Sequence, residues 1–309
     1  VRISALSTAA YVLAFWSGNF QLRAIFGTTE LLVVLGLTTL VIGSSLGVTV
    51  QILLGTGQTV PTSPDLVGAH ATAQTGGYLV LVAAGFIEWQ LTGGGKRSML
   101  GLVQVGLLFI GGLLLSFSLL SAAQIGPDLA QALPGIATLF TLAGILIIAF
   151  RLGRAALGVS WVTGGARHIA VAVGFLVLAV VLQAILVQQF IASQGDFTKI
   201  SVGLLHALDH SFFVGLMTNV LFGAILVLTA DRPRAWPWAD NVIFWGLNLG
   251  AAAFITVLLT AGSGEGKAAF THPVAFVAPI MGLSALLGIA TLLMRLQGAP
   301  APEIAPART

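Results

Sequence analysis

Three histidines in this chain lie within long apolar segments, where an ionisable side chain is costly and is usually functional. They are His70, His206 and His210. Imidazoles that face one another across a bundle of helices are the usual ligands of a heme iron, and they also bind other transition metals. These residue types therefore predict heme or metal chemistry, provided that the helices bring the rings to one depth.

The segments around these histidines place them at a similar distance from one membrane face. His70 lies near the start of an apolar segment over Leu66–Leu91. His206 and His210 lie near the start of a second segment over Ile200–Leu228, which runs in the same direction. At 1.5 Å of rise per residue, all three lie roughly 7–16 Å inside the outer boundary of the membrane.

Two further histidines stand at the ends of predicted helices. His272 precedes a third segment of the same direction, Pro273–Leu296, and is the candidate for a second metal site. His168 precedes Ile169–Ile191, which starts from the opposite face. We therefore exclude His168 from the cluster and expect it to be an interfacial or packing residue.

The spacing of the histidines leaves the kind of site open. His206 and His210 are four residues apart and share one helix face, which suits two ligands of one metal or two adjacent centres. A bis-imidazole heme needs one histidine from each of two facing helices, which His70 and His210, or His70 and His206, would supply. Asp209 can fix the tautomer of a neighbouring ring. Small residues would let a flat macrocycle approach the backbone: Ala69, Ala71, Ala73, Gly76 and Gly77.

Composition assigns the chain to the polytopic membrane proteins. Of its 309 residues 57% are hydrophobic and 7% are charged, with a mean hydropathy of +1.02. There is no cysteine, which excludes disulfides, thiolate catalysis, iron–sulfur clusters and covalent c-type heme. The pI of 9.8 does not indicate nucleic-acid binding, because the 13 basic residues set membrane topology.

Apolar runs of about 20 residues predict an all-α transmembrane bundle of eight or nine helices. We expect one transmembrane domain over residues 1–297, a disordered tail over 298–309, and no internal repeat. Eight runs are uninterrupted and a ninth, Ile3–Phe26, contains polar residues. The eight are Leu31–Leu54, Leu66–Leu91, Met99–Ala122, Leu133–Phe150, Ile169–Ile191, Ile200–Leu228, Val242–Ala261 and Pro273–Leu296.

Other polar side chains inside these segments are assigned structural roles. Glu88 and Trp89 form an interface anchor at the inner end of their helix. Four amides are expected to make interhelical hydrogen bonds: Gln104, Gln183, Asn219 and Asn248.

The basic residues predict the orientation in a prokaryotic-type inner membrane. Ten lie on one side and three on the other, so we expect that the C-terminus is cytoplasmic and that the histidines lie near the outer face. The ten are Arg23, Lys96, Arg97, Arg151, Arg154, Arg167, Arg232, Arg234, Arg295 and Arg308; the three are Lys199, Lys267 and, if Ile3–Phe26 spans the membrane, Arg2.

The histidine-bearing helices resemble those of heme-copper oxidase and nitric oxide reductase catalytic subunits, and of the related NnrS-type membrane proteins. The segment at residues 206–223 reads HALDHSFFVGLMTNVLFG, with a histidine pair before a glycine-punctuated apolar helix. The segment at residues 69–78 reads AHATAQTGGY and is similar to the early helix of that family that bears a low-spin heme ligand. Residues 244–250, FWGLNLG, resemble the helix that follows the pair.

This resemblance implies that His70 and His210 are axial ligands of a b-type heme. His206 would match the neighbouring ligand, which in the oxidases serves a second heme. The chain departs from the family in the spacing of the pair, which is four here and two in the oxidases. It also lacks the adjacent histidine pair of the copper site and the outer arginines that would hold heme propionates. The chain alone is therefore not expected to reduce oxygen or nitric oxide.

The leading hypothesis is thus a b-type cytochrome-like membrane subunit with one heme b, or two. It would carry electrons near the outer face within a larger respiratory complex, as the electron-transfer subunit of an oxidoreductase. Its partners would be other membrane subunits, a quinone or an external electron donor. Two alternatives stay open: a proton or metal-ion transporter that uses the histidines, and a structural membrane subunit without a cofactor.

Overall fold

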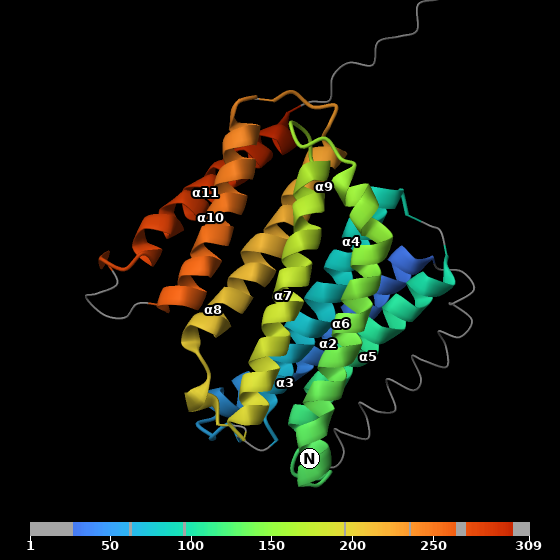
Figure 1. The fold of residues 1–309 in the computed structure, drawn as a ribbon, viewed down its shortest axis with the longest axis vertical. Coiled ribbons are helices and arrows are strands. Elements are labelled where there is room, and N and C mark those ends of the chain that lie inside the picture. The colour runs from blue at the N-terminus through green and yellow to red at the C-terminus, as the bar shows by residue number, and fades with distance from the viewer. Residues whose placement is uncertain are drawn as a thin grey trace, which may run out of the picture. The chain divides into compact units, whose positions relative to one another are not determined.

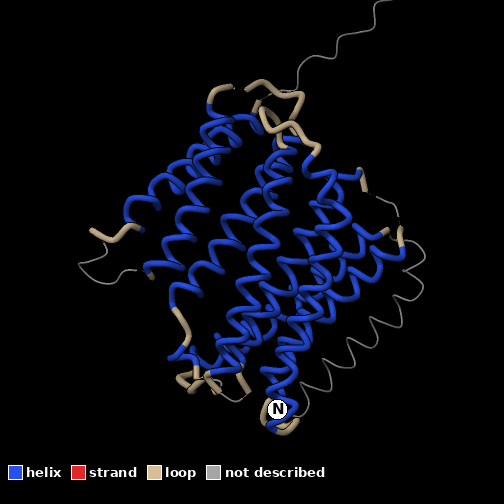
Figure 2. Tube along the Cα trace, in the orientation of Figure 1, coloured by secondary structure: helices blue, strands red, loops and turns tan. Residues whose placement is uncertain are grey.

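The computed structural model describes residues 27–61, 64–94, 97–194, 196–234, 236–263 and 270–298. Within these ranges the chain is helical and contains no strand (Figures 1 and 2). The elements are α2 (Thr28–Gly55), α3 (Leu66–Thr72), η1 (Ala73–Leu79), α4 (Val80–Thr92), α5 (Met99–Ser121), α6 (Pro127–Leu157), α7 (Ala166–Ala192), η2 (Phe197–Lys199), α8 (Val202–His210), η3 (Ser211–Thr218), α9 (Asn219–Leu228), α10 (Ala239–Ala261) and α11 (Val274–Gln297).

The eight uninterrupted apolar segments are confirmed as helical segments. Seven helices are long and apolar enough to cross a membrane. The eighth, formed by α3, η1 and α4, is present but carries His70, Gln74 and Glu88 within its length. The chain is therefore an integral membrane protein with a polytopic helical fold. The predicted helix Ile3–Phe26 and the tail from residue 299 lie outside the described residues.

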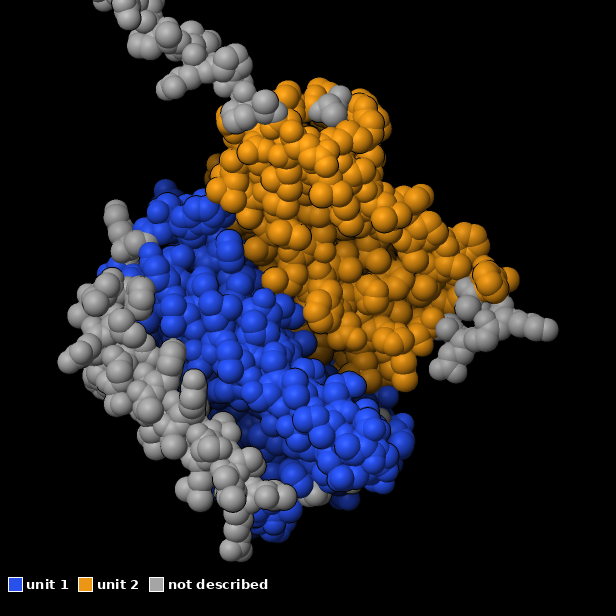
Figure 3. Space-filling model, turned by 180° about the vertical axis from the view of Figure 1, so that it is seen from behind, with its two compact units in different colours: residues 1–154, 176–200 blue, residues 155–175, 201–309 orange. Residues whose placement is uncertain are grey.

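The contacts divide the chain into two compact units, which Figure 3 colours separately. Unit 1 consists of Val1–Arg154 and Leu176–Ile200, and unit 2 consists of Ala155–Phe175 and Ser201–Thr309. The continuous helix α7 contributes its first ten residues to unit 2 and the remainder to unit 1.

In unit 1, α2 packs along α3, η1 and α4 through glycines that remove side chains from the contact. A Cβ on Gly36 would lie 2.7 Å from a Val82 methyl group, and one on Gly43 would lie 2.7 Å from the Gln74 amide nitrogen. On the other side of η1, a Cβ on Gly112 of α5 would lie 2.8 Å from the Gly77 Cα atom. These close approaches allow backbones to pack tightly in a bilayer, where small residues favour helix association.

An ion pair lies inside unit 1 between α4 and α6. The Arg151 guanidinium donates to both Glu88 carboxylate oxygens, at 2.5 and 3.0 Å, and to the Gln104 amide oxygen at 2.6 Å. The Glu88 side chain is 4% exposed and the Arg151 side chain 14% exposed. Glu88 is therefore a buried partner of Arg151 and not the interface anchor expected from the sequence.

In unit 2, α10 packs on α11 and on α8. A Cβ on Gly250 would lie 2.9 Å from the Met281 backbone nitrogen, and one on Gly203 would lie 2.3 Å from the Leu258 carbonyl oxygen. Ser201 caps α8 by accepting a hydrogen bond from the Leu204 N–H at 3.3 Å.

Helix α6 is longer than the apolar run Leu133–Phe150 that predicted it. It begins at Pro127, whose fixed φ suits the first helical position. The Asp128 carboxylate in the first turn is stabilised by the positive end of the helix dipole. It ends at Leu157, beyond Arg154. Hydropathy alone detects the apolar middle of such a helix, because its polar ends extend past the hydrocarbon layer.

Two spans contain a π-helical segment, which the periodicity of the sequence did not predict. Segment η1 follows α3 directly, and η3 follows α8 directly. In η3 the Thr218 hydroxyl donates to the Phe213 carbonyl five residues earlier, at 2.9 Å. Such segments are rare and occur frequently at functional sites. Here each one follows a histidine-bearing turn.

The buried ion pair predicts a stability difference between two variants. Glu88→Ala leaves the Arg151 charge without its carboxylate partner, so we expect a loss of about 3 kcal/mol and a lower melting temperature in detergent. Lys199→Ala is the control, because it breaks an exposed pair with Asp196 whose side chains are 67% and 40% exposed. Equal melting temperatures for the two variants would contradict a stabilising role of the Glu88–Arg151 contact.

Candidate functional site

His70 projects from α3 onto α2 within unit 1. Its Nδ1 atom lies 2.7 Å from the Gly43 carbonyl oxygen. A Cβ on Gly47, one turn further along α2, would lie 2.8 Å from the ring Cε1 atom and 2.9 Å from Nδ1. The glycine pair on α2 therefore has two roles at this histidine: Gly43 accepts its hydrogen bond and Gly47 leaves room for its ring.

The hydrogen bond selects the tautomer of the neutral His70 ring. A carbonyl oxygen can only accept, so Nδ1 carries the proton and donates it. The lone pair of the neutral imidazole is then on Nε2. Histidines that bind metals usually show this arrangement, in which the second ring nitrogen donates to a carbonyl or carboxylate.

His210 shows the same arrangement in unit 2. Its Nδ1 atom lies 2.7 Å from the carbonyl oxygen of His206, one turn earlier on α8. Nδ1 is again the donor, and Nε2 carries the lone pair. The ring also contacts Phe254 of α10, with centroids 4.5 Å apart. The tautomer of His210 is thus set by a backbone carbonyl and not by Asp209, which the sequence had suggested.

The two other candidate ligands differ from His70 and His210. The His206 ring is exposed. His272 has both ring nitrogens engaged: Val274 N–H donates to Nδ1 at 3.3 Å, and Nε2 donates to the Ala261 carbonyl at 3.1 Å. His272 thus ties the start of α11 to the end of α10, and it could bind a metal only if one of these bonds broke. Its assignment to a second site stays a prediction.

The small residues expected beside a macrocycle are largely used by helix packing. Ala69, Ala73, Gly76 and Gly77 are buried, whereas Ala71 is exposed. A Cβ on Gly76 would lie 3.1 Å from the Gln183 amide nitrogen, and one on Gly77 would lie 3.1 Å from the Thr39 Cβ atom. These residues therefore pack helices of unit 1 against one another. They do not mark a surface for a macrocycle, so the case for heme depends on the histidine rings alone.

His168 is a buried packing residue, one of the two roles expected from the sequence, but its hydrogen-bond partner was not predicted. His168 is 1% exposed, and its Nδ1 atom donates to the Asn219 amide oxygen at 2.8 Å. Asn219 donates to the Asn248 amide oxygen at 2.7 Å, and Asn248 donates to the Phe244 carbonyl at 2.7 Å. The interhelical hydrogen bonds expected of Asn219 and of Asn248 are confirmed, and the two side chains bond to each other. Two asparagines in the middle of neighbouring spans were the signal that a third polar group is buried with them.

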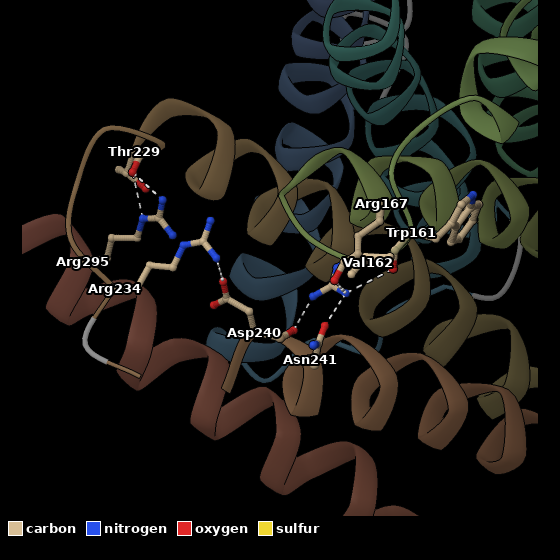
Figure 4. A network of polar contacts seen from close by, with 8 residues as sticks. All are labelled: Trp161, Val162, Arg167, Thr229, Arg234, Asp240, Asn241 and Arg295. Atoms are coloured by element: carbon tan, nitrogen blue, oxygen red, sulfur yellow. Dashed lines mark hydrogen bonds and ion pairs between the residues drawn. The ribbon is translucent and has the colours of Figure 1, made fainter. Parts of the chain in front are cut away.

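The residue before His168 anchors one end of unit 2 (Figure 4). Arg167 is 1% exposed and donates to the Val162 carbonyl at 2.8 Å and to the Asp240 carbonyl at 2.7 Å. It also donates to the Asn241 amide oxygen at 2.6 Å, and its guanidinium carbon lies 4.3 Å from the Phe244 ring centroid. Arg167 therefore joins loop and helix ends within unit 2, in addition to being one of the ten basic residues that predict the membrane orientation.

His70 belongs to unit 1, and His206, His210 and His272 belong to unit 2. Across the described ranges, no three His, Cys, Asp or Glu side chains are grouped closely enough to hold a metal ion by themselves. A bis-imidazole heme requires two nitrogen ligands, because the porphyrin supplies the other four. His70 in unit 1 and His210 in unit 2 each carry a lone pair on Nε2 when neutral.

Comparison of the chain with protein-family models, with curated proteins and with solved structures found no match. The likeness to the oxidase and nitric oxide reductase subunits therefore depends only on the residues quoted above.

Proposed function

We propose that this chain is a heme-binding, b-type cytochrome-like membrane subunit in which the Nε2 atoms of His70 and His210 are axial iron ligands. The observation that carries this proposal is shared by both histidines. Each donates Nδ1–H to a backbone carbonyl at 2.7 Å, and each lies in the turn before a π-helical segment.

These hydrogen bonds prepare the rings for iron. Donation from Nδ1 fixes the tautomer, holds the ring plane and makes Nε2 a more basic ligand. Gly47 keeps the space that the His70 ring occupies. Bound heme b would supply a one-electron redox centre. One heme is expected from two ligands, and a second would require His206 or His272.

The proposed location is the inner membrane of a prokaryotic-type cell, with the C-terminus in the cytoplasm. Within unit 2, the bond from Arg167 to the Asp240 carbonyl joins the starts of α7 and α10. The bonds from Arg295 to the Thr229 carbonyl join the ends of α9 and α11. All four helix ends thus carry or adjoin arginines, which supports a cytoplasmic assignment by the positive-inside rule. The histidines of α8 would then lie toward the outer face.

The proposed partners are other membrane subunits of a redox complex, together with a quinone or an external electron donor. The connections between the described helices are short, so they offer little surface to a soluble partner. Reduction of oxygen or nitric oxide by this chain alone is not proposed, because the adjacent histidine pair of a copper site is missing from the sequence.

The first test removes the two ligands separately. We expect His70→Ala and His210→Ala each to abolish the b-type band in a reduced-minus-oxidised spectrum, because low-spin iron needs both axial nitrogens. His272→Ala should retain the band, since both of its ring nitrogens have other partners. Retention of a low-spin spectrum in both ligand variants would contradict the assignment, and metal analysis would then test the transport alternative.

A second test disturbs the His70 ring without removing it. Gly47→Ala would place a methyl group 2.8–2.9 Å from ring atoms and displace the Nδ1–H from the Gly43 carbonyl. Since loss of such a supporting bond typically weakens metal binding by about 10–100-fold, we expect heme titration to show that loss of affinity.

Gly55→Ala on the same helix is the matched control, because its Cβ would meet no heavy atom within 4 Å. If both alanine variants bound heme as tightly as the wild-type chain, the positioning role of Gly47 would be wrong.

A further inference from the structure

One end of unit 2 carries more positive than negative charge. Arginines and aspartates gather where α7 and α10 begin and where α9 and α11 end. The cations are Arg167, Arg232, Arg234 and Arg295, and the carboxylates are those of Asp231 and Asp240. Among the described residues, four cations against two carboxylates leave an excess of two positive charges at this end.

Arg295 is a buried arginine whose hydrogen bonds go to a single acceptor. It is 6% exposed, and its Nε and Nη2 atoms both donate to one acceptor, the Thr229 carbonyl, at 2.8 and 2.6 Å. The carboxylate of Asp240 is instead engaged by Arg234 at 3.4 Å. Among the described residues, no carboxylate forms an ion pair with Arg295. A buried charge without an ionic partner is costly, and an anion beside it would reduce that cost.

A small, shallow surface hollow opens between these groups within unit 2. Its polar lining comes from Arg234, Trp236, Asp240, Thr291 and Arg295. In Figure 4 the guanidinium group of Arg234 stands between that of Arg295 and the Asp240 carboxylate. Two guanidinium groups that line one hollow repel each other, and a phosphate accepts hydrogen bonds from both in the geometry that arginine favours.

The surroundings of the hollow match a lipid headgroup. Trp236 lines the hollow and is exposed, as is Trp238 two residues later, and exposed tryptophans are typical of the boundary between lipid and water. Leu293 and Leu296 in the last turns of α11 are also exposed and apolar, so acyl chains can lie against them. Basic pockets at the ends of transmembrane helices on the positively charged side bind anionic headgroups.

We propose that the hollow lined by Arg234 and Arg295 binds the phosphate of an anionic phospholipid headgroup. Arg295 provides the buried charge, and Arg234 provides the exposed one, with a side chain that is 42% exposed. This site lies at the end of unit 2 opposite the start of α8, so it does not depend on heme binding.

The experiment uses the full chain in detergent and measures its melting temperature with added short-chain phosphatidylglycerol, phosphatidylcholine or inorganic phosphate. Arg234→Gln tests the site, because this exposed side chain can be replaced without emptying the core. Arg295→Lys is the second variant, since it keeps the charge and loses the planar fork that binds phosphate. Arg154→Gln, an exposed arginine of unit 1, is the matched control.

We expect phosphatidylglycerol to raise the melting temperature of the wild-type chain and of Arg154→Gln, and phosphatidylcholine to have no such effect. Arg234→Gln and Arg295→Lys should each require at least about fivefold more phosphatidylglycerol for the same shift, as expected for one lost basic contact near an anionic surface. An unchanged response in both pocket variants would overturn the proposal. So would an equal shift with inorganic phosphate, which would show a free-anion site.

Discussion

The constraint on which this structure depends is the lack of water inside a bilayer, which makes a polar group without a protein partner costly in a span. In unit 1 the Glu88 carboxylate meets Arg151 at 2.5 Å. In unit 2 the chain of bonds from His168 through Asn219 to Asn248 ends on a backbone carbonyl. Each contact joins different helices, so the polar groups also specify which helices pack together.

The same constraint explains the geometry of the candidate ligands. A histidine side chain in a span needs a partner for its N–H, and His70 and His210 both use a backbone carbonyl through Nδ1. The consequence is chemical, because the lone pair then lies on Nε2 in both rings. For His70 this arrangement requires a neighbouring helix that lacks a side chain at Gly47 and offers the Gly43 carbonyl one turn earlier. Helix packing and the tautomer of His70 thus depend on the same contact in unit 1.

Hydropathy predicted the helical fold well, because a bilayer imposes length and apolarity on every span. It predicted the partners of polar groups less well, since a partner distant in sequence leaves no periodic trace. Asn219 and Asn248 were recognised as interhelical residues, but the hydrogen bond between Asn219 and His168 was not. The π-helical segments after His70 and His210 could not be predicted either, because one extra residue in a turn does not change the apolar character of a span. The division into two units likewise follows from contacts and not from composition.

The central claim is that this chain holds heme b, and a heme count on the purified wild-type protein tests it most directly. A pyridine hemochrome assay combined with a protein assay gives the number of hemes and their type. The account predicts one b-type heme per chain, with a reduced-minus-oxidised spectrum typical of bis-imidazole iron. A fully assembled chain that contains no heme would contradict the account.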